Sequence, residues 1–338
     1  MIYEIEGTEG LIQVMEQELR HLMPELNIYK RMSDAIQIES GRSIDALLTS
    51  RTANAVYALQ RFDVPRPKAL LGHQNFHLLL KQIQQAFVIS GRANFQTLHL
   101  NAAGSGSSVM RRLKNELAMH TGLTIDEEAG DLLLRIRRVE SGWETLVRLT
   151  PRPLATRDWR VADMEGALNA SVAAMMNLLT ASIKDGVFVN LMCGSGTLMI
   201  ERAALGNTGQ IIGCELETTA LELASKNIAA ADLSHDVQLL QADVTRLPFD
   251  DQTVDVLCAD LPFGQLVGSH DENRTLYPAT LQEAARLARP HGILILITHE
   301  IRLMETVLTN QHDWVVQETH KITLRGLHPR IYLLRKRS

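Results

Sequence analysis

The stretch that decides the fold runs Val187-Phe188-Val189-Asn190-Leu191-Met192-Cys193-Gly194-Ser195-Gly196-Thr197. Its first four residues are typical of a buried strand, and a glycine-rich turn follows that strand directly. Residues 198–204 then have the composition of a helix. Glycines let a backbone approach a ligand closely, and the start of a helix presents free N–H groups. The order strand, Gly-x-Gly turn, helix therefore predicts one corner of a nucleotide-type binding site.

Strand and helix patterns alternate along the chain after this corner. Strand-like runs are expected at 210–215, 237–242, 254–260 and 292–298, with helices between them, such as 218–231 and 279–288. This alternation predicts a parallel sheet with helices on both faces. The end of the chain differs, because 314–324 and 330–335 read as an antiparallel pair of strands.

Acidic side chains follow two of the predicted strands at the edge where an open α/β sheet binds its ligands. Glu215 ends the second strand, and a carboxylate there can accept both hydroxyls of a ribose. Asp243 follows the third strand and can accept a hydrogen bond from an exocyclic amine such as that of adenine. Together with the Gly194–Gly196 turn, these residues indicate a nucleotide-like cofactor.

The fourth strand ends in Asp260-Leu261-Pro262-Phe263-Gly264, the most specific motif of the chain. Proline fixes the turn and leaves the neighbouring carbonyls free as acceptors. Asp260 and the Leu261 carbonyl can accept hydrogen bonds from one NH2 group, while Phe263 offers a flat face for stacking. The motif therefore predicts a pocket for an exocyclic amine on an aromatic heterocycle.

Composition places the chain among globular proteins. Of its 338 residues 45% are hydrophobic and 22% charged, which leaves room for two or three domains. No apolar run has the length of a membrane span, and the first residues do not resemble a signal peptide. The three cysteines (Cys193, Cys214 and Cys258) lack CxxC spacing, and the twelve histidines lack ligand spacing. We therefore expect a cytoplasmic protein with neither a metal site nor disulfides.

Charge is distributed unevenly along the chain. Residues 51–160 carry sixteen Lys/Arg and nine Asp/Glu, whereas residues 161–338 carry fourteen and twenty-one. A basic middle section can meet a polyanion while the acidic part binds something smaller, although a solvated surface gives the same balance. Basic residues gather at the start of a predicted helix and again near the C-terminus: Arg111, Arg112, Lys114, then Arg325, Arg330, Arg335, Lys336 and Arg337.

The first 150 residues read as two small units separated at 63–67, where two prolines interrupt the pattern. The first unit alternates strand 1–6, helix 10–23, strand 35–39, a helix at 43–50 capped by Ser43, and strand 53–62. The second has a helix at 76–88 capped by Asn75, strand 95–100, a helix at 109–121 capped by Ser108, and strands 131–139 and 143–149. A further helix at 166–181 leads into the C-terminal half.

These motifs resemble those of the amino-methyltransferases that use S-adenosylmethionine, and most closely the THUMP-domain RNA methylases that form N(2)-methylguanosine in tRNA. The Asp260–Phe263 tetrad resembles the D-L-P-F form of the family's N/D-P-P-Y/F motif. Asn190 stands where the family usually has Asp, and Leu261 replaces the first proline. Further matching stretches are Arg51-Thr52-Ala53, Thr121-Gly122-Leu123, Arg157–Arg160 and Gly166-Ala167-Leu168-Asn169.

The resemblance implies a chain of α/β and α+β domains. A ferredoxin-like domain would occupy residues 1–65 and a THUMP RNA-binding domain residues 66–152. A Rossmann-like methyltransferase domain with a seven-stranded sheet would occupy residues 153–338, with 153–165 as a linker. The substrate implied is a flipped guanine in the tRNA acceptor stem, with the two N-terminal domains on the acceptor end. We expect a monomer with no membrane partner.

The resemblance also implies roles for single residues. Those that act on the amine would be Asp260, Leu261, Pro262 and Phe263. Those that contact S-adenosylmethionine would be Asn190, Cys193, Gly194, Gly196, Thr197, Glu215, Leu216, Asp243, Val244 and Asp260. RNA contacts are predicted for Arg111, Arg112, Lys114, Arg157 and Arg160. The neutral Asn190 is expected to contact the methionine amino group more weakly than Asp.

Other functions fit parts of the sequence. The tetrad is also compatible with methylation of adenine in DNA or RNA, or of a guanine in ribosomal RNA. A non-catalytic RNA-binding protein would not need the full set Gly194, Gly196, Glu215, Asp243 and Asp260. A nicotinamide dehydrogenase shares the strand–turn–helix corner but has no use for Asp260–Gly264.

Overall fold

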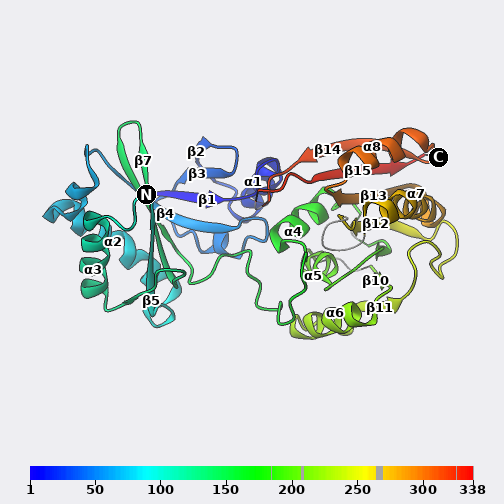
Figure 1. Cartoon of the computed structure of the whole chain (residues 1–338), viewed down its shortest axis with the longest axis horizontal. Coiled ribbons are helices and arrows are strands. Elements are labelled where there is room, and N and C mark those ends of the chain that lie inside the picture. The colour runs from blue at the N-terminus through cyan, green and yellow to red at the C-terminus, as the bar shows by residue number, and fades with distance from the viewer. Residues whose placement is uncertain (184, 207–208, 264–268, 325, 338) are drawn as a thin grey trace. The chain divides into compact units, whose positions relative to one another are not determined.

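The computed structural model describes residues 1–338 except 184, 207–208, 264–268, 325 and 338 (Figure 1). Contacts divide the chain into two compact units. One comprises residues 1–7 and 15–155, and the other comprises residues 8–14 and 156–338. The packing of residues 8–14 with the C-terminal half was not predicted from the sequence. None of the described helices has the length and apolar character that crossing a membrane requires.

The first unit is built on an eight-stranded sheet in the order β2-β3-β1-β4-β8-β7-β5-β6. Its strands are β1 (Ile2–Glu6), β2 (Ile28–Arg31), β3 (Ala35–Glu39), β4 (Ala55–Phe62), β5 (Thr97–Ala102), β6 (Thr124–Ile125), β7 (Leu132–Val139) and β8 (Gly142–Arg148). Strand β4 precedes residue 65 and β8 follows it, and the two pair in antiparallel fashion. One sheet therefore includes strands from both sides of the predicted domain boundary. The division into a ferredoxin-like and a THUMP domain stays a prediction.

Three α-helices belong to this part of the chain: α1 (Ile12–Leu22), α2 (His73–Ser90) and α3 (Ser108–Thr121). The predicted caps are wrong. Helix α2 starts after Gly72, so Asn75 lies inside it and donates to the Ala69 carbonyl. Helix α3 is capped by Ser107, one residue earlier than predicted. Residues 45–49 form a 3-10 helix, so Ser43 caps no α-helix.

The Arg51-Thr52-Ala53 motif is held against α1 by one carboxylate. Glu18 accepts hydrogen bonds from the backbone N–H groups of Arg51 at 2.9 Å and Thr52 at 3.1 Å. It also accepts the hydroxyls of Ser50 and Thr52. Because charged acceptors make the stronger hydrogen bonds, Glu18 fixes the chain just before β4.

The second unit is built on a seven-stranded sheet in the order β11-β10-β9-β12-β13-β15-β14. Its strands are β9 (Phe188–Asn190), β10 (Ile211–Glu215), β11 (Val237–Gln241), β12 (Val254–Asp260), β13 (Ala288–Thr298), β14 (Trp314–Lys321) and β15 (Arg330–Lys336). β9 to β13 pair in parallel, and β15 runs antiparallel to both of its neighbours. The predicted parallel sheet with an antiparallel end is confirmed.

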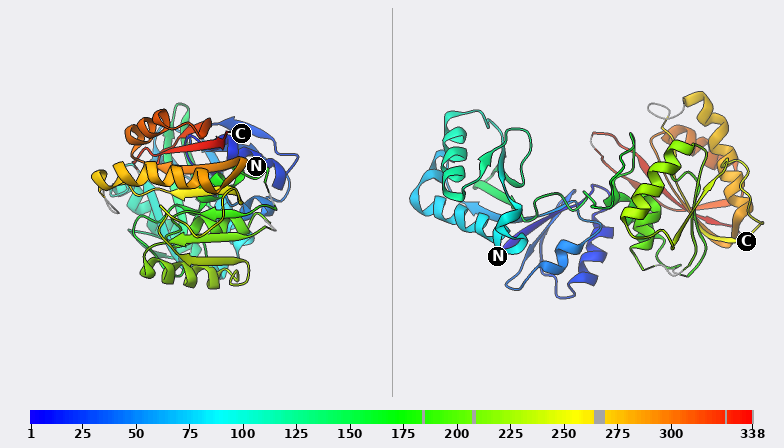
Figure 2. Two further views of the ribbon diagram at one scale, coloured as in Figure 1. Left: turned by 90° about the vertical axis from the view of Figure 1, so that its right-hand side faces the viewer. Right: turned by 90° about the horizontal axis from the view of Figure 1, so that it is seen from below.

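Helices cover both faces of this sheet (Figure 2). On one face pack α4 (Ala170–Leu179), α5 (Thr197–Ala203) and α6 (Thr218–Ala230). On the other pack α7 (His270–Leu287) and α8 (Ile301–Asn310). Helix α4 begins four residues later than predicted, because Asn169 caps it by accepting from the N–H groups of Ser171 and Val172. Residues 166–168 are therefore outside the helix.

Gly10 provides a test of how the N-terminal segment packs within the second unit. Its φ is +89°, and an added Cβ would lie 1.9 Å from the Lys321 carbonyl oxygen. Gly10→Ala should lower the free energy of unfolding by about 3 kcal/mol, since both strain and a backbone clash oppose it. Gly41→Ala is the matched control, because nothing lies within 4 Å of its added Cβ. Urea unfolding measures both. Equal stabilities would contradict this packing.

Candidate functional site

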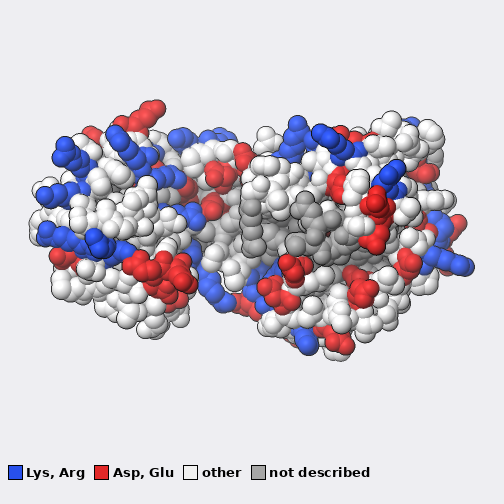
Figure 3. Space-filling view, in the orientation of Figure 1, with Lys and Arg blue, Asp and Glu red and all other residues white. Residues whose placement is uncertain are grey.

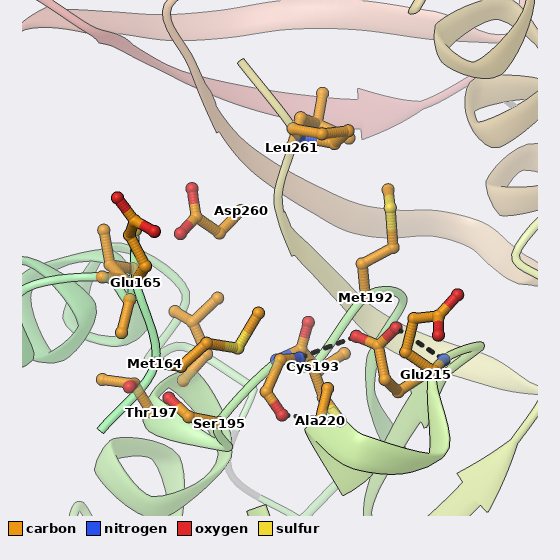
Figure 4. Close-up of a pocket in the computed structure, with 18 of the residues that line it drawn as sticks. Met164, Glu165, Met192, Cys193, Ser195, Thr197, Glu215, Ala220, Asp260 and Leu261 are labelled. Carbon is orange, nitrogen blue, oxygen red and sulfur yellow. Dashed lines mark hydrogen bonds between the residues drawn. The ribbon is translucent and has the colours of Figure 1, made fainter. Parts of the chain in front are cut away.

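A cavity of about 270 Å³ opens at the carboxyl ends of three neighbouring strands. Asn190 ends β9, Glu215 ends β10 and Asp260 ends β12, and all three line the cavity. Figure 4 shows Glu215 and Asp260 in it. β9 lies between β10 and β12, which is where the strand order reverses and where open α/β sheets bind their ligands. The structure therefore brings together three of the four strand-end residues that the sequence analysis selected.

The glycine turn forms one wall of the cavity. Gly194 has a φ of +50° and Gly196, which precedes α5, a φ of +89°. The Gly194 N–H donates to Oε2 of Glu215 at 2.9 Å, while Oε1 accepts from the N–H groups of Leu216 and Glu217. A carboxylate offers about four acceptor positions, so Glu215 is fixed in place and still has acceptor capacity toward a ligand.

Two residues that line the cavity each have a buried side-chain oxygen with no hydrogen-bond partner among the described residues: Oδ1 of Asn190 and Oδ1 of Asp260. Leaving a buried polar atom without a hydrogen bond costs about 1–3 kcal/mol. Two such unpaired acceptors therefore point to a ligand that donates hydrogen bonds. Burial alone raises the pKa of the Asp260 carboxyl to about 7. Asp260 is therefore poised to exchange a proton near neutral pH.

The Asp260–Phe263 turn continues the cavity wall. The Leu261 N–H donates to the Ile297 carbonyl at 3.0 Å, and no described residue donates to the Leu261 carbonyl. The Pro262 carbonyl, in contrast, accepts from Asn273 and Tyr277. The Phe263 ring lies edge-on against His299, with centroids 4.1 Å apart. Gly264, the last residue of the predicted motif, is outside the described residues.

A segment that sequence reasoning only partly identified also lines the cavity. Met164, Glu165, Gly166, Ala167 and Leu168 line the cavity before α4 begins. Asn227 holds this segment. Its Oδ1 accepts from the N–H groups of Val161 and Ala162, and its Nδ2 donates to the carbonyls of Ala162 and Ser195. One buried amide thus joins the segment to the glycine turn.

Three predicted cofactor residues are not among those that line this cavity. Asp243 is exposed and accepts two hydrogen bonds from Thr245, which hold its pKa below the ordinary value. Leu216 is 56% exposed, and Val244 is buried in the core on the α7 side. None of them is among the residues that line the cavity, whereas Cys193 and Thr197 are. A cofactor contact by Asp243, Leu216 or Val244 stays a prediction.

The cysteines are buried, and burial raises the pKa of each thiol. A thiol held neutral is a poor nucleophile, so packing accounts for all three. In the described part of the chain, no group of three or more His, Cys, Asp or Glu residues is arranged to hold a metal ion.

Two of the five predicted RNA contacts lie open to solvent. Arg111 and Arg112 are exposed on α3, in a region where Lys and Arg side chains gather (Figure 3). Lys114 is buried and pairs with Glu127 at 2.6 Å. An RNA contact by any of the three stays a prediction, and the burial of Lys114 together with its pairing to Glu127 disfavours it for Lys114. Arg325 of the C-terminal basic group is outside the described residues.

The other two predicted RNA contacts have structural partners. Arg157 Nε donates to buried Glu201 at 2.9 Å, with 9% of the arginine side chain exposed. Arg160 Nη2 donates to the Leu168 carbonyl and to the Thr197 hydroxyl, both at 2.9 Å. These bonds tie the segment before α4 to helix α5. They give both arginines a role in shaping the cavity that the sequence did not reveal.

The sheet order, the glycine turn and the acidic strand ends together define a Rossmann-like methyltransferase domain. The chain belongs to the RMKL-like methyltransferase domain family, whose model matches residues 157–330. The matched residues include every strand end that lines the cavity.

Individual proteins that are similar to this chain are also named as methyltransferases. A relative from Bos taurus named tRNA (guanine(6)-N(2))-methyltransferase THUMP3 is 30% identical over 182 residues, which are 50% of this chain and 36% of that protein. The chain thus spans about a third of its length. A relative from Methanocaldococcus jannaschii named tRNA (guanine(6)-N2)-methyltransferase is 22% identical over 74% of this chain and 76% of its own.

Solved structures support the fold of the whole chain. TrmN from Thermus thermophilus superposes with a TM-score of 0.79 at 23% identity, covering 99% of both chains. The predicted fold class is confirmed for the methyltransferase half, and the fold of the complete chain recurs in a solved protein.

Asn227 should stabilise both the fold and the cavity. Asn227→Ala removes four hydrogen bonds and leaves the carbonyls of Ala162 and Ser195 without their donor. We expect the free energy of unfolding to fall by about 3 kcal/mol. Ser225→Ala, at an exposed position of the same helix, is the control. Thermal unfolding followed by circular dichroism measures both variants. An equally small loss of stability in the two would contradict the bridging role of Asn227.

The raised pKa of Asp260 predicts how stability depends on pH. The folded protein keeps this carboxyl protonated up to about pH 7, whereas an unfolded chain releases the proton near pH 4. Burial therefore destabilises the folded state increasingly from about pH 4 to pH 7, and constantly above that. Asp260→Asn should raise the unfolding free energy by about 4 kcal/mol at pH 8 and by little at pH 4. A pH-independent difference in urea unfolding would contradict the shift.

Proposed function

We propose that this protein is an S-adenosylmethionine-dependent methyltransferase that forms N(2)-methylguanosine in tRNA, acting on a flipped guanine of the acceptor stem. The observation that carries the proposal is the unpartnered Oδ1 of Asp260, which shares a cavity with the glycine turn and Glu215. The cavity thus has room for a cofactor, and a residue that can accept hydrogen bonds from an amine lies at the same edge of the sheet.

The residues present fit the cofactor. Backbone with positive φ at Gly194 and Gly196 permits close approach of a ligand, and Oε2 of Glu215 has an acceptor position left for a ribose hydroxyl. The buried Asn190 Oδ1 is an acceptor for the amino group of the methionine part. When bound, S-adenosylmethionine supplies a methyl group on a positively charged sulfur.

The tetrad fits an amine. Asp260 Oδ1 and the Leu261 carbonyl can both accept N–H hydrogens from one exocyclic NH2 group, which aligns the nitrogen lone pair with the methyl group. Accepting those hydrogens also stabilises the charge that develops on nitrogen. With a pKa near 7, Asp260 can then take up the released proton. Phe263 offers a ring on which an extruded base can stack.

The choice of tRNA guanine rests on the relatives and on charge. The two relatives described above are named as tRNA guanine-N2 methyltransferases, and one of them matches three quarters of this chain. Arg111 and Arg112 are exposed on the basic part of the chain, where phosphate contacts would add affinity. A monomer working in the cytoplasm is part of the same proposal.

The test is transfer of labelled methyl groups from S-adenosylmethionine to unmodified tRNA, followed by nucleoside analysis. We expect the label on N(2)-methylguanosine. Asp260→Ala should lower kcat by at least about a thousandfold, while calorimetry still detects cofactor binding. Asp236→Ala, an exposed acid in the loop before β11, is the control.

Each other outcome of this assay has a definite meaning. Label on adenosine would redirect the proposal to an adenine amine. A label on ribosomal RNA alone would reassign the RNA substrate. Full turnover by Asp260→Ala would overturn the role of the tetrad. Binding of RNA with no transfer at all would favour a non-catalytic binding protein.

A further inference from the structure

The carbonyl of Pro262 is held by two side chains of helix α7. Asn273 Nδ2 donates to it at 2.9 Å and the Tyr277 hydroxyl donates at 2.8 Å. Both residues are fully buried, and they are four positions apart, which places them on the same side of the helix. No motif in the sequence marks either residue, because the contact depends on how α7 packs against the end of β12.

A third side chain fixes the direction of the Tyr277 hydroxyl. Thr298, at the end of β13, accepts the Glu300 N–H at 3.0 Å, which leaves its own hydroxyl hydrogen to donate. The Thr298 and Tyr277 hydroxyl oxygens are 2.7 Å apart. Since Tyr277 donates to Pro262, it must accept from Thr298. The chain of donors therefore runs from Glu300 through Thr298 and Tyr277 to the Pro262 carbonyl.

The turn is anchored on both sides of the groups that would meet the amine. On one side the Leu261 N–H donates to the Ile297 carbonyl of β13. On the other the Pro262 carbonyl is held by α7. Because proline has no N–H of its own, the turn cannot be held through that amide. Between the two anchors lies the Leu261 carbonyl, which no described residue uses.

We infer that Tyr277 is a positioning residue for methyl transfer, supported by Asn273 and Thr298. It fixes the Asp260–Phe263 turn so that the Leu261 carbonyl and Asp260 face the incoming amine. The inference rests on the proposed function. Rate depends steeply on this geometry, because small displacements of aligned groups cost large factors in turnover.

The test compares three variants of the full chain with the wild type. Tyr277→Phe removes the hydroxyl and keeps the ring, and Thr298→Val removes the second donor of the chain. Tyr332→Phe is the matched control, a buried tyrosine of β15 whose hydroxyl makes no hydrogen bond to the turn. These three and the double variant Tyr277→Phe/Thr298→Val are measured for kcat, KM for tRNA, Kd for S-adenosylmethionine and thermal unfolding.

We expect Tyr277→Phe to lower kcat about tenfold, which corresponds to one lost hydrogen bond, with cofactor Kd and KM within twofold of wild type. Thr298→Val should lower kcat less, and the double variant should match Tyr277→Phe because both act through one bond. Tyr332→Phe should keep wild-type kcat. A kcat within twofold of wild type for Tyr277→Phe, or an equal loss in cofactor affinity, would overturn the inference.

A second measurement tests the anchoring role of Tyr277 independently of the proposed function. Loosening the turn admits water to Asp260, which should lower the pKa of that carboxyl from about 7 toward its ordinary value. NMR titration of the side-chain carboxyl carbon of Asp260 measures this without substrate. If the wild type methylates no tRNA, the proposed function fails, yet the inferred anchoring is still decided by this titration. An unchanged pKa in Tyr277→Phe would then overturn it.

Discussion

The burial of oxygen acceptors at one edge of a parallel sheet is the constraint on which the rest of the site depends. Asn190 and Asp260 end adjacent strands, and each carries a buried Oδ1 that no described residue satisfies. An unpaired buried acceptor is costly, and the surrounding structure must hold it in place. Asn227 joins one wall of the cavity to the glycine turn, and Tyr277 joins another to helix α7.

Much of the second unit could be predicted from the sequence, because local patterns determine it. Apolar runs of strand length predicted the parallel strands, and Asn190, Glu215 and Asp260 followed from where those strands end. Helix α8 was missed, since residues 301–310 carry no strong cap or break in sequence. Cap positions in the first unit were wrong by one to three residues, because several neighbouring Ser, Asn or Gly residues could each serve.

The residues that support the site could not be predicted. Asn227 contacts Val161 and Ser195, which are 66 and 32 positions away. Tyr277 donates from helix α7 to the Pro262 carbonyl, 15 positions earlier in the chain. Arg157 is a residue whose predicted role differs from the contact seen in the structure. An RNA contact was predicted for Arg157 and stays a prediction, whereas the structure pairs it with buried Glu201, 44 positions further on. A charged side chain reveals its role only when the tertiary packing shows what it faces.

The asparagine at position 190 has a physical rationale in this setting. In the pairing of β9 with β12, Asn190 is opposite Cys258, two residues before Asp260, so the two strand ends open into the same cavity. Burial already raises the pKa of Asp260 to about 7. A second carboxylate at position 190 would raise that pKa further, because like charges disfavour ionisation. Asp260 would then be protonated at neutral pH and lose its capacity to accept a proton. A neutral acceptor at 190 keeps a hydrogen-bonding group for a ligand while leaving the proton affinity of Asp260 in the range where it is most useful.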